Sequence, residues 1–325
     1  MPAAPTHIQF AEDCLSRRSS AGLPALNPDL AGAVMAGTQG SDPFYIFGRI
    51  PWRRRARTAQ VQAFADFIHG RAPAYLFPPL AARAAEASGD DKALLGAYLY
   101  GFLLHYILDR TMHPYVYFRT GFNAEGEPTG IYSKDHMRYE TALASLLVSR
   151  RAAGGKEVWQ GPVADAASLE LIGSLYAEAL PGRVEPGDFS LAWKDFVMAR
   201  RLARDPWGLK GTLLDLLGVK SIFRAMMRPD RPSIGDRIDY ANDTHAVWLR
   251  PGDGVPSVAS VQDLWGDALK SADRLGAFLE RAMQGGAERQ DWEAAFGDLD
   301  HEGRHPGEKM RFFRSAYRPR DQRLP

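Results

Sequence analysis

The sequence predicts an all-α protein built from many helices. Apolar residues recur at helical spacing through most of the 325 residues, and no stretch shows a convincing alternating strand pattern. We find no internal repeat. Hydrophobic residues make up 45% of the chain and charged residues 24%, an ordinary globular composition that can bury a sizeable core.

The first part of the chain is expected to form four helices around one loop. Thr6 caps the first helix, and a short second helix follows Pro28 and closes at Gly37. The loop after it is punctuated by glycine and proline and holds Asp42. The three longer helices are predicted over residues 6–19, 57–70 and 73–87.

A long apolar helix is expected in the centre of the chain. Asp90 or Asp91 caps it, and Pro114 is expected to bend or end it. Residues 119–132 are rich in Gly, Asn and Pro and predict a loop. Ser133 is then expected to cap a helix over 133–151.

The second half of the chain also reads as helical. Its expected helices cover residues 165–179, 188–204, 208–227, 237–249 and 260–283. The pattern divides the chain into a helical domain over residues 1–285 and a charged, loosely held tail over 286–325. His301 and His305 fall in this tail, where we expect both to lie at the surface.

Charge and cysteine content favour an intracellular, cytoplasmic protein without a nucleic-acid partner. The net charge is +1, and the arginines at 53–57 and in the tail are expected to be solvated surface. Cys14 is the single cysteine, so the chain cannot form an internal disulfide. No secretory signal is recognised, and the apolar run from Ala93 to Leu108 is too short for a transmembrane segment.

The central helix carries a spacing typical of metal ligands. His105, Asp109 and His113 follow one another at intervals of four, which places them on one stripe of a helix. His136 and Glu140 repeat the interval on the next helix. Because ionisable groups on an otherwise apolar face are costly unless paired or metal-bound, this pattern predicts a metal site. Nitrogen and carboxylate ligands without thiolate favour Zn²⁺ in an open, catalytic arrangement.

Three further residues upstream are possible ligands. Each has an ordinary alternative: His7 as an exposed residue in a first helical turn, Asp42 as a turn former, and His69 as a partner of the helix dipole. His245, before Trp248, invites a role in the cleft, but a packed position on an amphipathic helix is favoured.

At these positions the sequence resembles the zinc-dependent phospholipase C family. The specific part is GFLLHYILDRTMHPYV, and an early Thr-His, a GSDPF loop, a histidine ending a later helix and HMRYE complete the pattern. The resemblance covers roughly residues 6–145, and its matching positions are His7, Asp42, His69, His105, Asp109, His113, His136 and Glu140.

The resemblance implies a multi-helical bundle, like those of phospholipase C and the S1/P1 nucleases, around a multinuclear zinc site. One zinc ion would be held by Asp42, His69, His105 and Asp109. A second would be held by the remaining matched positions, His113, His136 and Glu140. Asp109 would bridge to a third zinc ion bound by His7, so two or three ions are expected.

Three functions follow as hypotheses. The first is a phospholipase C-type phosphodiesterase acting on a phospholipid or another phosphodiester, with Asp42 as candidate general base. The second is an S1/P1-like nuclease, for which the arginines beside Trp52 could serve, although no stable nucleic-acid complex is expected. The third is a helical protein whose zinc is structural or whose cleft binds a partner without turnover.

Overall fold

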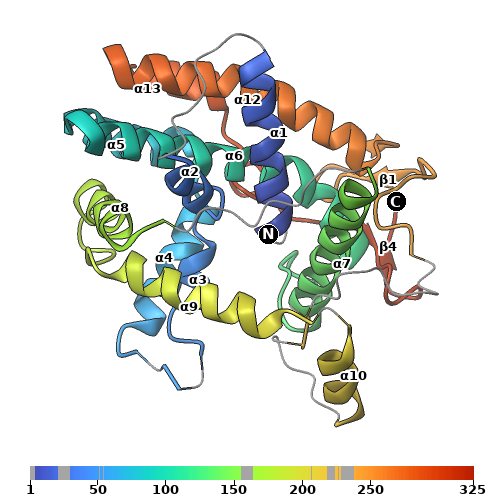
Figure 1. Cartoon of the computed structure of the whole chain (residues 1–325). Coiled ribbons are helices and arrows are strands. Elements are labelled where there is room, and N and C mark those ends of the chain that lie inside the picture. Colours follow the sequence, from blue (N-terminus) through green and yellow to red (C-terminus); the bar gives the residue numbers. More distant parts are fainter. Residues whose placement is uncertain are drawn as a thin grey trace.

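The computed structural model describes residues 4–20, 30–50, 52–53, 55–154, 164–205, 207–217, 224–225, 227 and 238–325. This part of the chain is mostly helical, which confirms the predicted all-α class (Figure 1). Its helices are α1 Ala4–Ser20, α2 Ala31–Gly37, α3 Asp42–Ile46, α4 Thr58–His69, α5 Pro73–Glu86, α6 Gly89–Thr120, α7 Ile131–Ala153, α8 Ala166–Ala179, α9 Asp188–Ala203, α10 Leu209–Leu216, α12 Val261–Gly285 and α13 Arg289–Phe296.

Two short antiparallel ladders accompany the helices. β1 (Trp248–Leu249) pairs with β2 (Pro256–Ser257), and β3 (Phe313–Arg314) pairs with β4 (Gln322–Arg323). Each strand contains two residues, which is too short for an alternating pattern to be recognised in the sequence. No helix in the described ranges combines the length and apolar character that crossing a membrane requires.

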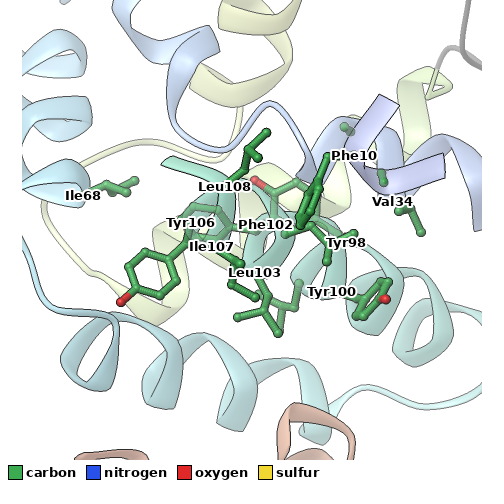
Figure 2. Close-up of a cluster of buried hydrophobic side chains, with 14 of the residues drawn as sticks. Phe10, Val34, Ile68, Tyr98, Tyr100, Phe102, Leu103, Tyr106, Ile107 and Leu108 are labelled. Carbon is green, nitrogen blue, oxygen red and sulfur yellow. The ribbon is translucent and has the colours of Figure 1, made fainter. Parts of the chain in front are cut away.

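The central helix α6 organises the core. It is 32 residues long, and nearly every side chain from Leu95 to Thr120 is buried. A helix that is apolar on all sides has to be surrounded by other elements, and α1, α2, α5, α7, α8 and α12 pack around it (Figure 1). Figure 2 shows aromatic and aliphatic side chains of α6, among them Phe102 and Leu103, within this core.

Two glycines allow α2 and α6 to cross at very short distance. A Cβ placed on Gly37 would lie 2.1 Å from the carbonyl oxygen of Tyr98, and one on Gly101 would lie 2.0 Å from the carbonyl oxygen of Val34. The backbones themselves are therefore in contact, and no larger residue fits at either position. This crossing fixes where the C-terminal end of α2, and the loop that follows it, meets α6.

The central helix also passes through Pro114 instead of ending there. It continues to Thr120, and Gly121 ends it with a positive φ of 85°. The side chains of Tyr115, Val116 and Phe118 after the proline are buried, so packing of this last part offsets the hydrogen bond that proline cannot donate. The following helix α7 starts at Ile131 with Gly130 as N-cap, two residues before the predicted cap Ser133.

Two other helix predictions need correction. The helix expected over 208–227 ends at Leu216, and its residues 218–223 and 226 lie outside the described part of the chain. The helix expected over 237–249 is wrong for residues 238–249, which form turns and strand β1. Asn242 and His245 there have φ of 53° and 51°, a left-handed conformation that a helix cannot contain. His245 is accordingly an exposed turn residue and not a packed helical one.

The tail packs on the helical body, contrary to the expectation that it is loosely held. The Arg311 amide donates to the Pro251 carbonyl at 2.6 Å, and the Ala316 amide donates to the Arg119 carbonyl at 2.7 Å. Phe313 is buried against Tyr117 and Phe122 at the end of α6. The boundary placed at residue 285 stays a prediction, but residues beyond it belong to the packed structure.

Arg53, Arg55 and Arg57 pair with carboxylates of α9, which corrects the prediction that they are solvated surface. Arg54 lies outside the described part of the chain. Arg55 makes two hydrogen bonds of 3.0 Å to the fully buried carboxylate of Asp195 on α9. Arg53 lies 3.5 Å from the same carboxylate, and Arg57 lies 3.0 Å from Asp188. These ion pairs tie the α3–α4 loop to α9 and occupy the cations that a nucleic-acid phosphate would need.

Candidate metal centre

The structure brings all eight predicted ligands into one buried cluster. They come from five helices: His7 from α1, Asp42 from α3, His69 from the end of α4, three from α6 and two from α7. Seven of the eight residues are at most 5% exposed, and His136 is 12% exposed in its side chain. Burial overturns the alternative of an exposed helix residue for His7. Asp42 in the first turn of α3 and His69 in the last turn of α4 do occupy the positions of their alternatives, but both side chains also face the cluster.

The ligand atoms form three groups in which every atom lies within 4.8 Å of the others. The groups are His7 with Asp42 and His105, His69 with His105 and Asp109, and His113 with His136 and Glu140. The resemblance assigned Asp42 to the same ion as His69, whereas this geometry groups Asp42 with His7. Donor sets of imidazole and carboxylate suit Zn²⁺ and related divalent ions.

Asp109 lies at the centre of the cluster. Its Oδ2 atom faces His105 Nε2 at 3.1 Å and His69 Nε2 at 3.7 Å. Its Oδ1 atom faces His7 Nε2 at 3.3 Å and His113 Nε2 at 4.0 Å. The two oxygens of one carboxylate thus point to different histidines, which is the arrangement of a bridging ligand.

The distances within the groups match ligands around a shared ion. Glu140 Oε1 lies 3.0 Å from His136 Nε2 and 3.4 Å from His113 Nε2. Ligand atoms held about 2.0–2.1 Å from a tetrahedral zinc ion lie about 3.3 Å from one another. The atoms of the cluster are therefore already at the spacing that such an ion imposes.

Hydrogen bonds on the outer side of the rings decide which nitrogen faces the cluster. The Nδ1 atom of His105 lies 3.1 Å from the Thr38 carbonyl oxygen, and that of His113 lies 2.8 Å from the His301 carbonyl oxygen. A carbonyl oxygen can only accept, so Nδ1 must carry the proton. His69 Nδ1 lies 3.3 Å from the Ala65 carbonyl oxygen, which can likewise only accept, and 2.7 Å from Ser41 Oγ. Such contacts orient metal-binding imidazoles in proteins.

The inner nitrogens consequently present lone pairs to carboxylate oxygens. His105 Nε2 lies close enough to Asp109 for a hydrogen bond, but its ring proton is on the other nitrogen. Among the described residues, Nε2 of His69, His105 and His113 and both Asp109 oxygens have no hydrogen-bond partner. Buried lone pairs that face one another repel unless a cation lies between them. The cluster has the electrostatics of a metal centre.

The pKa shifts lead to the same conclusion. Burial by itself would raise the pKa of Asp109, but the neighbouring His105 and His113 hold the pKa of that carboxyl well below its usual range. Burial also lowers the pKa of His105 and of His136. At His69 burial acts in the same direction, but Asp109 and Asp42 outweigh it and raise the pKa of that ring. A divalent cation between the carboxylates would supply positive charge without the need for protonated rings.

Asp42 predicts how zinc binding depends on pH. Burial raises its pKa to about 6, so below that pH a proton occupies the carboxylate that the metal needs. We expect zinc affinity to be constant above pH 7 and to fall about tenfold per pH unit below 6 for each proton displaced. Competition titrations with a zinc chelator between pH 5 and 8 measure this slope. A zinc affinity that stays constant from pH 5 to 8 would contradict the assignment of Asp42 as a zinc ligand.

His301 is a residue beside the cluster that the sequence did not reveal. Expected at the surface, it is fully buried, with its ring 5.0 Å from that of His69 and 5.1 Å from that of Tyr106. Its amide donates to the His69 carbonyl at 3.3 Å, and its carbonyl accepts from His113. His305, by contrast, is 62% exposed beside Asp298, as predicted.

The backbone around His301 can be tested through Gly303. This glycine has φ of 71°, and a Cβ there would lie 2.6 Å from the Arg110 carbonyl oxygen and 2.9 Å from Pro114 Cγ. Gly303→Ala is expected to displace the segment, to remove the His301 carbonyl from His113, and to weaken zinc binding about 10–100-fold. Isothermal titration with zinc measures the loss.

The matched control for that substitution is Gly307→Ala. Gly307 has almost the same φ, 76°, but a Cβ there meets no atom within 4 Å. It carries the backbone strain of about 1–2 kcal/mol without the collision. Equal zinc affinities in the two variants would show that the His301 carbonyl does not position His113.

Comparisons with protein-family models, with curated proteins and with solved structures found no match. The metal centre is therefore inferred from its own geometry: three groups of ligand atoms, a shared carboxylate, and imidazoles oriented by hydrogen bonds on their outer side.

Proposed function

We propose that the protein is a zinc-dependent phosphodiester hydrolase of phospholipase C type, using two or three zinc ions. The observation that carries the proposal is the position of Asp109, whose two oxygens face histidines of neighbouring ligand groups. Adjacent ions joined by a carboxylate are typical of enzymes that hydrolyse phosphate esters. The resemblance to zinc-dependent phospholipases C adds the substrate class.

His113, His136 and Glu140 would hold one ion, while the other two groups share His105, whose single inner nitrogen can bind only one of the ions held there. Zinc ions bound there would neutralise phosphate oxygens, polarise a water molecule and stabilise the departing oxygen. The side chains do the positioning: outer hydrogen bonds keep the inner nitrogens of His69, His105 and His113 directed at the cluster. Because these rings are packed and buried, they need little reorganisation when substrate binds.

Asp42 is the candidate general base. It is buried at the N-terminus of α3, and its Oδ1 atom lies 3.7 Å from His105 Nε2. Among the described residues this oxygen has no hydrogen-bond partner. A pKa of about 6 leaves the carboxylate ionised at pH 7 and close to the pH at which it would release a proton again.

A structural role for zinc is the second candidate. The observation that favours it is the enclosure of the cluster, since seven ligands are at most 5% exposed. Structural zinc sites are closed, whereas catalytic ones keep an open position. The nuclease hypothesis loses support because Arg53, Arg55 and Arg57 are paired with carboxylates.

The test combines metal content with turnover. Protein purified without chelator is analysed for zinc and assayed on p-nitrophenyl phosphorylcholine, phosphatidylcholine and single-stranded DNA. We expect two or three zinc ions and hydrolysis of the choline substrates in preference to DNA. A protein without zinc that hydrolyses none of them would contradict the proposal.

The variant Asp42→Asn separates catalysis from a structural role. The variant is assayed at a zinc concentration that restores the wild-type zinc content; loss of hydrolysis there supports the enzyme, and zinc without hydrolysis in the wild type supports the structural candidate. Asp267→Asn is the control, because Asp267 is an exposed carboxylate on α12 that pairs only with Lys270 in the described ion pairs.

A further inference from the structure

Helix α10 displays an apolar stripe to solvent. Its Leu209, Leu213 and Leu216 lie at positions i, i+4 and i+7, on one face of the helix, and are 70%, 56% and 80% exposed. Trp207, just before the helix, is 85% exposed, and Leu217, just after it, is 67% exposed. Exposed apolar groups scattered singly are ordinary, but five in one short segment mark an interaction site.

The helix is built so that this stripe points away from the protein. Gly211 is buried and Leu214 half-buried on its opposite side. The buried carboxylate of Asp205 accepts from the amides of Lys210 at 3.2 Å and Gly211 at 2.7 Å, which holds the first turn. A helix of eight residues is not stable alone in water, so these contacts maintain a conformation that exposes the leucines.

α10 lies apart from the helices around α6 (Figure 1). No helix or strand of the described part packs broadly on it. Its main described side-chain anchor is an ion pair: Arg224 donates to Asp215 at 2.9 and 2.6 Å. Polar contacts hold the helix, and no described helix or strand covers its apolar stripe.

The surrounding sequence is strongly basic. Residues 200–237 contain nine Lys or Arg and four Asp or Glu, an excess of five positive charges in a chain whose net charge is +1. A second copy of the chain would bring another basic segment to the stripe and be repelled. An anionic phospholipid surface would attract it, because basic residues near a membrane each contribute favourably.

We infer that α10 is an interfacial anchor that docks this protein on anionic phospholipid bilayers. Leucines on one face, a tryptophan beside them and a basic surrounding sequence are the composition of helices that lie in the membrane interface. The role of this anchor in hydrolysis rests on the proposed function. If the protein hydrolyses phospholipids, α10 would hold the metal centre at a surface made of its substrate.

The test measures binding without turnover. Full-length Asp42→Asn protein is sedimented with phosphatidylcholine vesicles that contain or lack phosphatidylglycerol. We expect binding to the anionic vesicles that weakens at high salt. Replacing Leu213 and Leu216 together by glutamate should weaken binding about tenfold or more.

Ile131→Glu is the matched control. Ile131 is 57% exposed, like Leu213, but lies at the start of α7, where an acidic residue is tolerated. It should leave vesicle binding unchanged, and circular dichroism checks that every variant is folded.

Equal vesicle binding by the Asp42→Asn parent and by the double variant would overturn the inference, as would absence of binding to anionic vesicles. A parent dimer that the double variant dissociates, with vesicle binding unchanged, would overturn it in favour of a contact between copies.

The outcome is separable from that of the proposed function. Vesicle binding through α10 by a protein that hydrolyses neither choline substrate would contradict the enzyme and leave the anchor standing. Hydrolysis of p-nitrophenyl phosphorylcholine without vesicle binding would support the enzyme and overturn the anchor. In wild-type protein, the double variant should lose activity on vesicles and keep it on the water-soluble substrate.

Discussion

Asp109→Asn is expected to remove the zinc that depends on this carboxylate and to abolish hydrolysis. Asparagine keeps the shape of the side chain but replaces one oxygen by an NH₂ group, which cannot bind a cation. Both Asp109 oxygens face imidazole nitrogens at 3.1–4.0 Å, so the loss reaches more than one group of ligands. Changes in outer-shell partners already cost about 10–100-fold in metal affinity, and a shared ligand should cost more.

Elemental analysis and hydrolysis of p-nitrophenyl phosphorylcholine check this expectation. The remaining zinc should be that of His113, His136 and Glu140, the group that does not include Asp109. Asp195→Asn is the control, because Asp195 is also a fully buried aspartate but pairs with arginines. That variant should lose stability and retain zinc. Full zinc content in Asp109→Asn would refute the shared-ligand geometry.

Gly101→Ala is expected to destabilise the fold by about 3 kcal/mol or more. The added methyl group would lie 2.0 Å from the Val34 carbonyl oxygen, which belongs to the backbone of α2. A backbone carbonyl cannot avoid the collision by changing rotamer as a side chain can, so the two helices would have to separate. Because Thr38, directly after α2, positions His105, zinc affinity should fall together with stability.

The same helix offers a control with the opposite expected sign. On Gly96 a Cβ would meet only Met283, at 3.4 Å from its terminal Cε atom, which can move. Gly96→Ala should therefore gain about 0.5–1 kcal/mol from the better helix propensity of alanine. Urea unfolding measures both. Equal destabilisation by the two substitutions would show that the crossing of α2 and α6 is not a close contact.

The ligands and most helices could be predicted because their signals are local. An interval of four between His105, Asp109 and His113 becomes one face as soon as the helix forms. The same holds for His136 and Glu140 on α7. Helix starts such as Pro73 and ends such as Gly37 are also set by nearby residues, so their bounds differ little from expectation.

What could not be predicted depends on contacts between distant residues. His301 follows no helical spacing, and only its burial between α4 and α6 gives it a role. Arg55 was expected at the surface because its partner, Asp195, is 140 positions away in the sequence. The turns around His245 replace a helix because the Asn242 side-chain amide lies within hydrogen-bond distance of three backbone carbonyls that follow it, those of Ala246, Val258 and Ala259.

The contact between His113 and His301 spans 188 positions of the chain. During synthesis, α6 is therefore complete long before the carbonyl that orients its third ligand, His113, has been added to the chain. The ring of His113 can take its final orientation only after the chain has been extended at least as far as residue 301.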